Sequence, residues 1–214
     1  MKKQKYDTHW MVGVALMSAV VILLASTPLG MIQTPVIKAT TSHIPVILGA
    51  ILFGPMAGAV LGGVFGLCSL VSNTVAPTLL SFAFSPFLST TGLVGAVKAL
   101  WISVGCRIFI GVAAGWLWIG LKKCRLGDLA ALPVVGFVGS MVNTVMVMGS
   151  IYLLLAQQYA QAKDVAITAV YGLIMGTVTG AGVMEAIAAL VLVTAIGKPL
   201  LHADLRLKKT GYRH

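Results

Sequence analysis

Arg107 and Glu185 are charged residues that lie within long apolar stretches of the sequence. A charge near the centre of a bilayer costs at least about 2.5–3.5 kcal/mol, and such residues commonly serve a function. The planar guanidinium of an arginine binds a carboxylate or phosphate through two parallel hydrogen bonds. Glu185 lies too far along the last apolar stretch to pair well with Arg107, so we expect it to have a structural or interface role. We therefore expect an anionic ligand to be the counter-ion of Arg107; the alternative is a structural arginine bonded to backbone carbonyls.

Other polar residues are expected to gather near Arg107 in the outer half of the protein. Asn143 and Thr144 reach a similar depth from the opposite side of the membrane, and Tyr171 lies in the outer part of the last apolar stretch. In the first external loop, Ser42 is a candidate helix N-cap, so its neighbours could either cap this helix or line the mouth of a pocket. The predicted ligand-binding residues are Arg107, Asn143, Thr144, His43, Thr41, Asn73 and Tyr171.

The sequence carries no recognisable catalytic set. It has no GxSxG, no Ser/His/Asp constellation, no DxD-like metal pair and no glycine-rich GK[ST] phosphate loop. Its four histidines form no ligand cluster, so we expect no catalytic residue, no metal site and no cofactor in this chain. A binding or transport role is favoured, and an intramembrane enzyme or a self-sufficient carrier are the alternatives.

The distribution of basic residues predicts both the environment and the orientation of the chain. It has 214 residues, of which 58% are hydrophobic and 9% charged, and 11 of its 15 Lys and Arg residues fall into three clusters. These clusters are Lys2, Lys3 and Lys5; Lys122, Lys123 and Arg125; and Lys198, Arg206, Lys208, Lys209 and Arg213. Basic residues beside apolar spans mark the cytoplasmic side of a membrane protein. We expect a multi-pass protein of the cell membrane, with both termini in the cytoplasm and no nucleic-acid partner.

The apolar stretches predict an all-α bundle of six transmembrane helices in one membrane domain, residues 1–214. A bilayer core needs about 20 helical residues per crossing, and the expected spans are 10–28, 43–54, 55–74, 99–121, 129–156 and 165–196. Residues 43–74 are read as two short spans with a tight turn at Gly54-Pro55, because two crossings place all three basic clusters on one side. The apolar start imitates a signal peptide, but we expect it to be retained as the first span. The broken external segment from Val75 to Lys98 is expected to pack onto the bundle as a lid or re-entrant piece.

Small residues recur at helical spacing in several predicted spans. The rows are Gly54, Gly58, Gly62 and Gly66; Gly111 and Gly115; and Gly172, Gly176 and Gly180. Such rows let helix backbones approach closely in lipid, so internal packing is the expected role of these glycines. Ala15, Ser18 and Ala19 in the first span form a small stripe that is a candidate docking face for another membrane protein.

Three segments resemble one family of membrane proteins. TPLGMIQTPVIKATTSHIPVILGAILFGPMAGAVLGGVFGL (Thr27–Leu67) is similar to the opening of the substrate-binding S components of energy-coupling factor (ECF) vitamin transporters. Further resemblance lies in CRIFIGVAAGWL (Cys106–Leu117) and VNTVMVMGSIYLL (Val142–Leu154), and in total it covers residues 10 to 196. HIPVILGAILFGP, followed by a glycine-rich span, is the most specific part.

The resemblance implies more than the residues alone indicate. An S component of this family binds one vitamin in its outer half and docks on a shared transmembrane subunit through an AxxxA pattern in its first helix, which Ala15 and Ala19 fit. Two cytoplasmic ATPase subunits use the ATP, and the S component topples in the membrane to release the vitamin inside. The absence of an ATP-binding motif in this chain agrees with a transporter in which partner subunits hydrolyse the ATP.

The resemblance is greatest to the pantothenate-specific members. Arg107 is consistent with this substrate, because pantothenate offers a carboxylate together with hydroxyls and an amide for Asn143 and Thr144. Folate and biotin are also carboxylates, whereas riboflavin does not require an arginine. The alternative substrates are therefore folate, biotin, riboflavin, pyridoxine and a thiamine-precursor pyrimidine.

Overall fold

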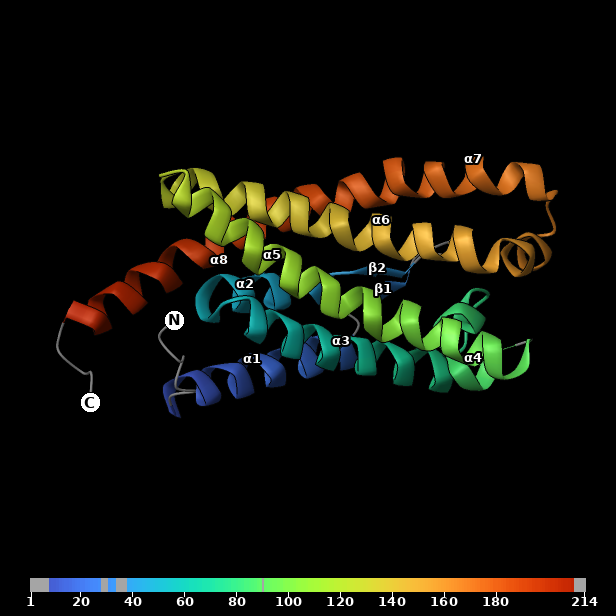
Figure 1. Ribbon diagram of the computed structural model, residues 1–214, viewed down its shortest axis with the longest axis horizontal. Helices are drawn as coiled ribbons and strands as arrows, with labels where there is room; N and C mark the ends of the chain where they lie inside the picture. The colour runs from blue at the N-terminus through green and yellow to red at the C-terminus, as the bar shows by residue number, and fades with distance from the viewer. Residues whose placement is uncertain (1–7, 28–30, 34–37, 90, 210–214) are drawn as a thin grey trace.

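Apolar helices account for nearly all of the structure. The computed structural model describes residues 8–27, 31–33, 38–89 and 91–209, and within them six helices lie side by side in one bundle (Figure 1). They are α1 (Thr8–Ser26); α2 (His43–Phe53); α3 (Pro55–Val75); α4 (Gly92–Leu100), which continues through the π-helical segment η3 (Trp101–Gly105) into α5 (Cys106–Lys123); α6 (Asp128–Lys163); and α7 (Ile167–Thr177), which continues through the π-helical segment η4 (Val178–Gly182) into α8 (Val183–Lys209). The predicted all-α membrane bundle is confirmed.

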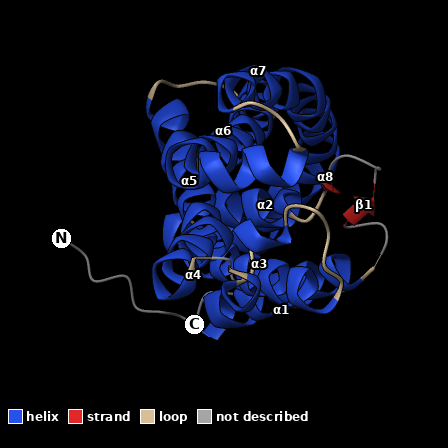
Figure 2. Ribbon diagram, turned by 90° about the vertical axis from the view of Figure 1, so that its right-hand side faces the viewer, coloured by secondary structure: helices blue, strands red, loops and turns tan. Residues whose placement is uncertain are grey.

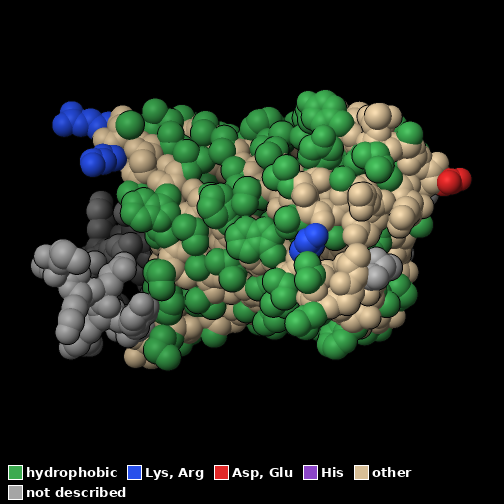
Figure 3. Space-filling view, turned by 45° about the vertical axis from the view of Figure 1, so that its right-hand side comes forward, with side chains coloured by type: hydrophobic (Ala, Val, Ile, Leu, Met, Phe, Trp, Pro, Cys, Tyr) green, Lys and Arg blue, Asp and Glu red, His purple; other side chains and the backbone are tan. Residues whose placement is uncertain are grey.

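Four helices are long and apolar enough to cross a membrane. They are Pro55–Val75, Gly92–Lys123, Asp128–Lys163 and Ile167–His202, whereas α1 and α2 are shorter apolar helices. On the face shown in Figure 3, hydrophobic side chains cover much of the surface, and most of the charged side chains lie near its two ends. An apolar surface of this kind fits a bilayer core.

Three helices extend further than the sequence predicted, and one of them is the last, which continues to Lys209 beyond the expected residue 196. The helix expected to begin at residue 99 begins at Gly92, so the segment between α3 and α4 is 76–91. Its described residues, 76–89 and 91, include two short 3-10 turns, η1 (Ser81–Ala83) and η2 (Pro86–Leu88). The helix α6 continues to Lys163, beyond the expected residue 156, because Gln, Ala and Lys are good helix formers. It is broken once, at Leu155 (φ −135°, ψ 23°), where the ammonium of Lys98 donates a hydrogen bond of 3.0 Å to the carbonyl of Leu154.

A small antiparallel β-hairpin interrupts the connection between α1 and α2. Its strands are β1 (Met31–Gln33) and β2 (Lys38–Thr40), with Met31 opposite Thr40. The hairpin lies at the side of the bundle near α8 (Figure 2). No strand was expected from the sequence, since three-residue strands leave no periodic signal.

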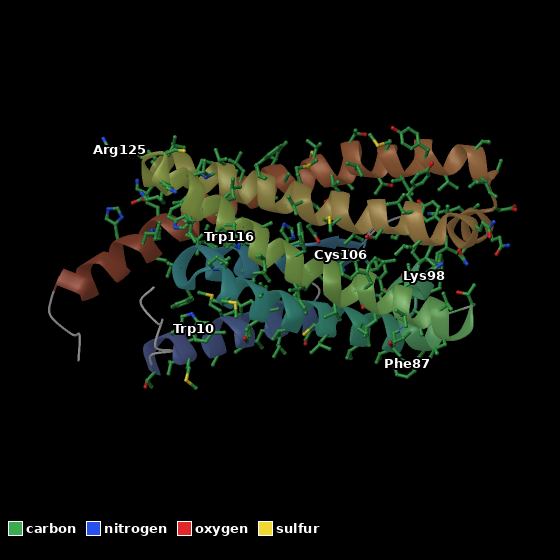
Figure 4. All side chains as sticks on the ribbon, viewed as in Figure 1. Trp10, Phe87, Lys98, Cys106, Trp116 and Arg125 are labelled. Atoms are coloured by element: carbon green, nitrogen blue, oxygen red, sulfur yellow. The ribbon has the colours of Figure 1, made fainter. Side chains whose placement is uncertain are left out.

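Three chain segments meet at one end of the bundle, here called the basic end and defined by Lys122, Lys123 and Arg125 in the α5–α6 turn. The start of α1, the α2–α3 turn and the C-terminal end of α8 lie at the same end (Figure 1), and Arg125 is labelled there in Figure 4. Lys122 forms a salt bridge of 2.6 Å with Asp128. The predicted basic residues Lys2, Lys3, Lys5 and Arg213 lie outside the described residues. The segment 76–91 lies at the other end, here called the opposite end.

The contact between α3 and α5 depends on glycine. A Cβ atom added at Gly62 would overlap the carbonyl of Arg107, and one added at Gly66 would lie 2.7 Å from the carbonyl oxygen of Ser103. Gly58 and Gly111 face each other in the same way, so the two backbones touch along several turns. Packing was correctly predicted for Gly58, Gly62 and Gly66, whereas a Cβ added at Gly54 would find no heavy atom within 4 Å.

The row on α7 and η4 differs from the row on α3. Cβ atoms added at Gly172, Gly176 or Gly180 would find no heavy atom within 4 Å, so the packing expected for these glycines is not seen.

The short helix α2 forms the centre of the bundle. All of its residues from His43 to Ile51 are buried, and it contacts α1, α3, α5, α6 and α8. Its 11 residues span only about 16 Å at 1.5 Å per residue. The turn after it requires Gly54, whose φ of 91° is rarely adopted by other residues. Because α2 ends near the basic end, its N-terminus lies inside the bundle, and this places His43 in the interior.

The close α3–α5 contact predicts a specific sensitivity to a single methyl group. Gly62→Ala should destabilise the protein by about 1–3 kcal/mol, because its Cβ must displace the backbone of Arg107. Thermal unfolding in detergent measures this change. The matched control is Gly176→Ala, which has open space and should be neutral or stabilising; equal effects of the two substitutions would contradict the packing argument.

Candidate ligand-binding site

Three pairs of neighbouring helices bring Arg107, Asn143 and His43 to one depth. On α3, Gly62 is in contact with Arg107 of α5. The thiol of Cys106 lies 3.7 Å from the carbonyl oxygen of Met146 on α6. A Cβ at Gly139 would lie 2.9 Å from the side chain of Ile47 on α2.

His43 is one helical turn from Ile47, and Asn143 is one turn from Gly139. Because α2 and α6 run in opposite directions (Figure 1), one turn of about 5.4 Å from this contact leads along α2 to His43 and along α6 to Asn143. These residues therefore belong to one polar layer, defined here as His43, Arg107, Ser140, Asn143 and Thr144.

The polar layer lies between two apolar clusters. Cys106 and Val147 belong to the cluster toward the opposite end, and Ile110 and Val135 belong to the cluster toward the basic end. Cys106, next to Arg107 in the sequence, lies about midway along the bundle in Figure 4. Apolar packing on both sides keeps water away from the layer, which strengthens any electrostatic interaction made within it.

Several polar atoms of this layer have no partner. The side chains of Arg107, Ser140 and Asn143 are 5%, 0% and 6% exposed, yet the Nε of Arg107, the Oγ of Ser140 and the Oδ1 of Asn143 make no hydrogen bond. A buried polar group left without a partner costs about 1–3 kcal/mol. A polar ligand at this depth could supply hydrogen-bond partners to all three atoms.

Arg107 is held by its own helix and by two aromatic rings. Its Nη1 donates a hydrogen bond of 2.9 Å to the carbonyl of Ile102, within the π-helical segment η3. Its Cζ lies 5.0 Å from the ring centre of Phe65 and 5.3 Å from that of Phe84. Both distances are in the range of cation–π attraction.

No carboxylate of the described residues forms a salt bridge with Arg107. Glu185 of α8 is half-buried and attracts Arg107 only from a greater distance. The depth of Arg107 also differs from the expected one, because its helix begins at Gly92 and adds about 10 Å of helix on the outer side. The layer therefore lies closer to the middle of the bundle than the sequence suggested.

Thr144 contacts both its own helix and the segment η4. The hydroxyl of Thr144 donates a hydrogen bond of 3.3 Å to the carbonyl of Ser140, and its methyl group would lie 2.8 Å from a Cβ at Gly182 in η4. The π-helical segments η3 and η4 thus flank the layer on two sides. Segments of this kind frequently occur at functional sites.

Asn73 is buried but is used within the protein. Its amide donates a hydrogen bond of 2.8 Å to the carbonyl of Ser69, and its Oδ1 accepts one of 2.9 Å from the hydroxyl of Ser81. Thr74 and Ser85 add a hydroxyl pair at 2.8 Å. These bonds fasten the segment 76–91 to α3, so Asn73 helps to position Phe84.

The remaining predicted residues lie at the edge of the layer or away from it. Thr41 is half-buried, and its carbonyl accepts a hydrogen bond of 3.0 Å from the backbone of Ile44 at the start of α2. Ser42 is the N-cap residue, but its side chain makes no capping bond. Tyr171 is 58% exposed and packs edge-to-face against Tyr152 with ring centres 5.9 Å apart, so the structure does not bring it to the layer.

The predicted docking stripe lies on the outer face of α1. Ala15 and Ala19 are exposed, and so are the neighbouring Met11 and Leu16, whereas Val14 is buried against the bundle. Near the basic end, the indole of Trp10 donates a hydrogen bond of 3.0 Å to the carbonyl of Phe53 and fastens α1 to α2.

Three residues of the site were not among the predicted ones: Ser140, Phe65 and Phe84. A signal existed for Ser140, because it precedes Asn143 and Thr144 by one helical turn. Phe65 and Phe84 carry no polar group, and only the fold brings their rings to Arg107. Among the described residues, no three His, Cys, Asp or Glu side chains gather as metal ligands would.

Comparison with known proteins gives two matches. The sequence model of the family "ECF transporter, substrate-specific component" matches residues 9–197. The pantothenic acid transporter PanT of Lactococcus lactis subsp. cremoris (strain MG1363) is 36% identical over 169 residues, which is 78% of this chain and 80% of the relative. Both matches are to transport proteins, which points to a non-enzymatic role.

The bonds of Asn73 predict how the segment 76–91 responds to mutation. Asn73→Ala should loosen this segment by about 1 kcal/mol and speed its cleavage by chymotrypsin about fivefold, because Ser81 loses a buried partner. The cleavage rate of the purified protein measures this effect. Ser89→Ala is the control, since Ser89 bonds only near the exposed start of α4; an unchanged rate in Asn73→Ala would contradict the anchoring role.

Proposed function

Because the chain belongs to the family of substrate-specific components of ECF transporters and is a multi-pass protein of the cell membrane, we propose that it binds pantothenate in its polar layer and delivers it to the cytoplasm. The observation that carries this proposal is the buried guanidinium of Arg107, with an unpartnered Nε and no salt bridge within the described part of the chain. The similarity to PanT supports the choice of vitamin.

The charge distribution of the layer favours a carboxylate. Arg107 is always protonated, and its planar donors match the two oxygens of a carboxylate. The helix α2 begins in the same layer, at His43. The N-terminal end of a helix is the positive end of its dipole, and it also favours an anion. The carboxylate of pantothenate would occupy this electropositive part of the layer.

The other polar atoms suit the remainder of the molecule. Pantothenate carries hydroxyl groups and an amide besides its carboxylate. The Oδ1 of Asn143 is an acceptor without a donor, and the Oγ of Ser140 can donate or accept. Thr144 lies one turn from Ser140 and adds a third polar group from the same helix.

Transport itself requires partners. The proposed partners are an ECF transmembrane subunit, which contacts the exposed stripe of Ala15 and Ala19, and two cytoplasmic ATPase subunits, which use the ATP. The proposed orientation has the basic end in the cytoplasm; its support is the positive charge at Lys122, Lys123 and Arg125. The segment 76–91 would then face outward, on the side from which the vitamin arrives.

Ligand binding is the most direct prediction. Pantothenate at 100 times its Kd should stabilise the detergent-purified protein by about 2.7 kcal/mol in a thermal unfolding assay. Arg107→Gln should weaken binding at least about 30-fold, because the charged pair of hydrogen bonds is lost. Tyr171→Phe is the control and should bind as the wild type does, since Tyr171 lies outside the layer.

The outcomes of this binding assay test the choice of ligand and the role of Arg107 separately. Stabilisation by riboflavin or pyridoxine in place of pantothenate would contradict the carboxylate assignment while keeping the transport role. Full affinity of Arg107→Gln for pantothenate would contradict the role of the arginine.

Docking can be tested separately from binding. Ala19→Leu should abolish co-purification with the transmembrane and ATPase subunits, because the larger side chain prevents close approach of helices, and it should leave pantothenate binding unchanged. Ala188→Leu, at an exposed position of α8, is the matched control. Co-purification of Ala19→Leu at the wild-type level would show that α1 is not the docking face.

A further inference from the structure

The guanidinium of Arg107 lies near two aromatic rings that come from different parts of the chain. Phe65 belongs to α3 and is fully buried, and the glycine contact beside it sets its position relative to α5. Phe84 belongs to the segment 76–91, between η1 and η2. Both ring centres lie within 5.3 Å of Cζ, a distance at which a cation and an aromatic face attract each other.

The hydrogen bonds of Arg107 leave one particular edge of the guanidinium for a ligand. Its five N–H groups lie in one plane. Nη1 is bonded to the carbonyl of Ile102, whereas Nε is buried and has no partner. A carboxylate binds a guanidinium within this plane through two parallel bonds, and Nε and Nη2 form such an edge. The ring contacts and the Ile102 bond together restrict the rotation that would turn this edge away.

We propose that Phe84 is a positioning residue that determines specificity for a carboxylate, by holding the Nε–Nη2 edge of Arg107 toward the ligand. This inference rests on the proposed binding of pantothenate in the polar layer. Phe84 acts only through Arg107, so its contribution should be large for a ligand with a carboxylate and small for the same ligand without one. It also links the segment 76–91 to ligand recognition, because the bonds between Ser81 and Asn73 and between Ser85 and Thr74 fix the chain on both sides of Phe84.

The segment itself offers a matched control. Phe87 lies three residues further along and is 79% exposed, and it is labelled at the opposite end of the bundle in Figure 4. Substitution of Phe87 removes the same ring from the same segment. It should therefore reproduce any general effect on the segment without disturbing Arg107.

The test compares two ligands that differ at one group: pantothenate, and panthenol, in which a hydroxymethyl group replaces the carboxylate. Affinities are measured by titration calorimetry on the full-length protein in detergent. Phe84→Leu should weaken pantothenate about tenfold and change panthenol less than about twofold, because leucine fills the space without a ring to hold the cation. Phe84→Tyr keeps an aromatic ring and should retain the wild-type preference for pantothenate over panthenol. Phe87→Leu should leave both affinities unchanged.

The results separate this inference from the proposed function. If the wild-type protein does not bind pantothenate, the proposed function is overturned. If the wild-type protein binds it and Phe84→Leu weakens both ligands by the same factor, or neither, the positioning role of Phe84 is overturned and the proposed function stands. A loss of preference in Phe87→Leu equal to that in Phe84→Leu would also overturn it.

Discussion

Side chains are absent along one face of α3, and the backbone of α5 occupies the space they would fill. Gly58 and Gly62 leave room for carbonyl groups of α5, and Gly66 leaves room for that of Ser103 in the adjoining segment η3, so the helices touch through their main chains. Lipid tails are as apolar as the side chains of a helix, so burying apolar surface between two helices gives no hydrophobic driving force. Close contact of this kind is therefore a principal source of helix association in a membrane. The same contact sets the depth of Arg107 and brings the ring of Phe65 to its guanidinium. A ligand site at this depth therefore depends on residues that carry no side chain.

The polar layer is a compromise between stability and recognition. The apolar clusters on both sides consist of buried side chains, yet Arg107, Ser140 and Asn143 keep unpartnered polar atoms between them. A protein selected for stability alone would replace these residues with apolar ones of similar size. Their retention fits a site in which the ligand completes the hydrogen bonds. The short helix α2 contributes as well, because its N-terminus ends inside the bundle and adds a positive dipole end to the layer.

Much of this arrangement could be predicted from the sequence, and the exceptions have physical causes. Charge isolated in apolar sequence identified Arg107, and counting helical residues from opposite sides put Asn143 and Thr144 at its depth. The start of its helix at Gly92 was missed because Gly92–Lys98 is apolar and near prolines, a composition that also suits an irregular segment. Tyr171 was assigned by depth alone, since helical rise gives the level of a residue but not the direction of its side chain. Contacts such as that of Phe84 with Arg107 join distant segments and leave no local pattern.

The central claim is that Arg107 receives the carboxylate of a vitamin within the polar layer. An experimental structure of the protein bound to pantothenate tests it most directly. The account predicts the carboxylate in the plane of the guanidinium, within hydrogen-bond distance of Nε, with the hydroxyl and amide groups near Ser140, Asn143 and Thr144. Pantothenate bound elsewhere, with the Nε of Arg107 still unpartnered, would contradict it.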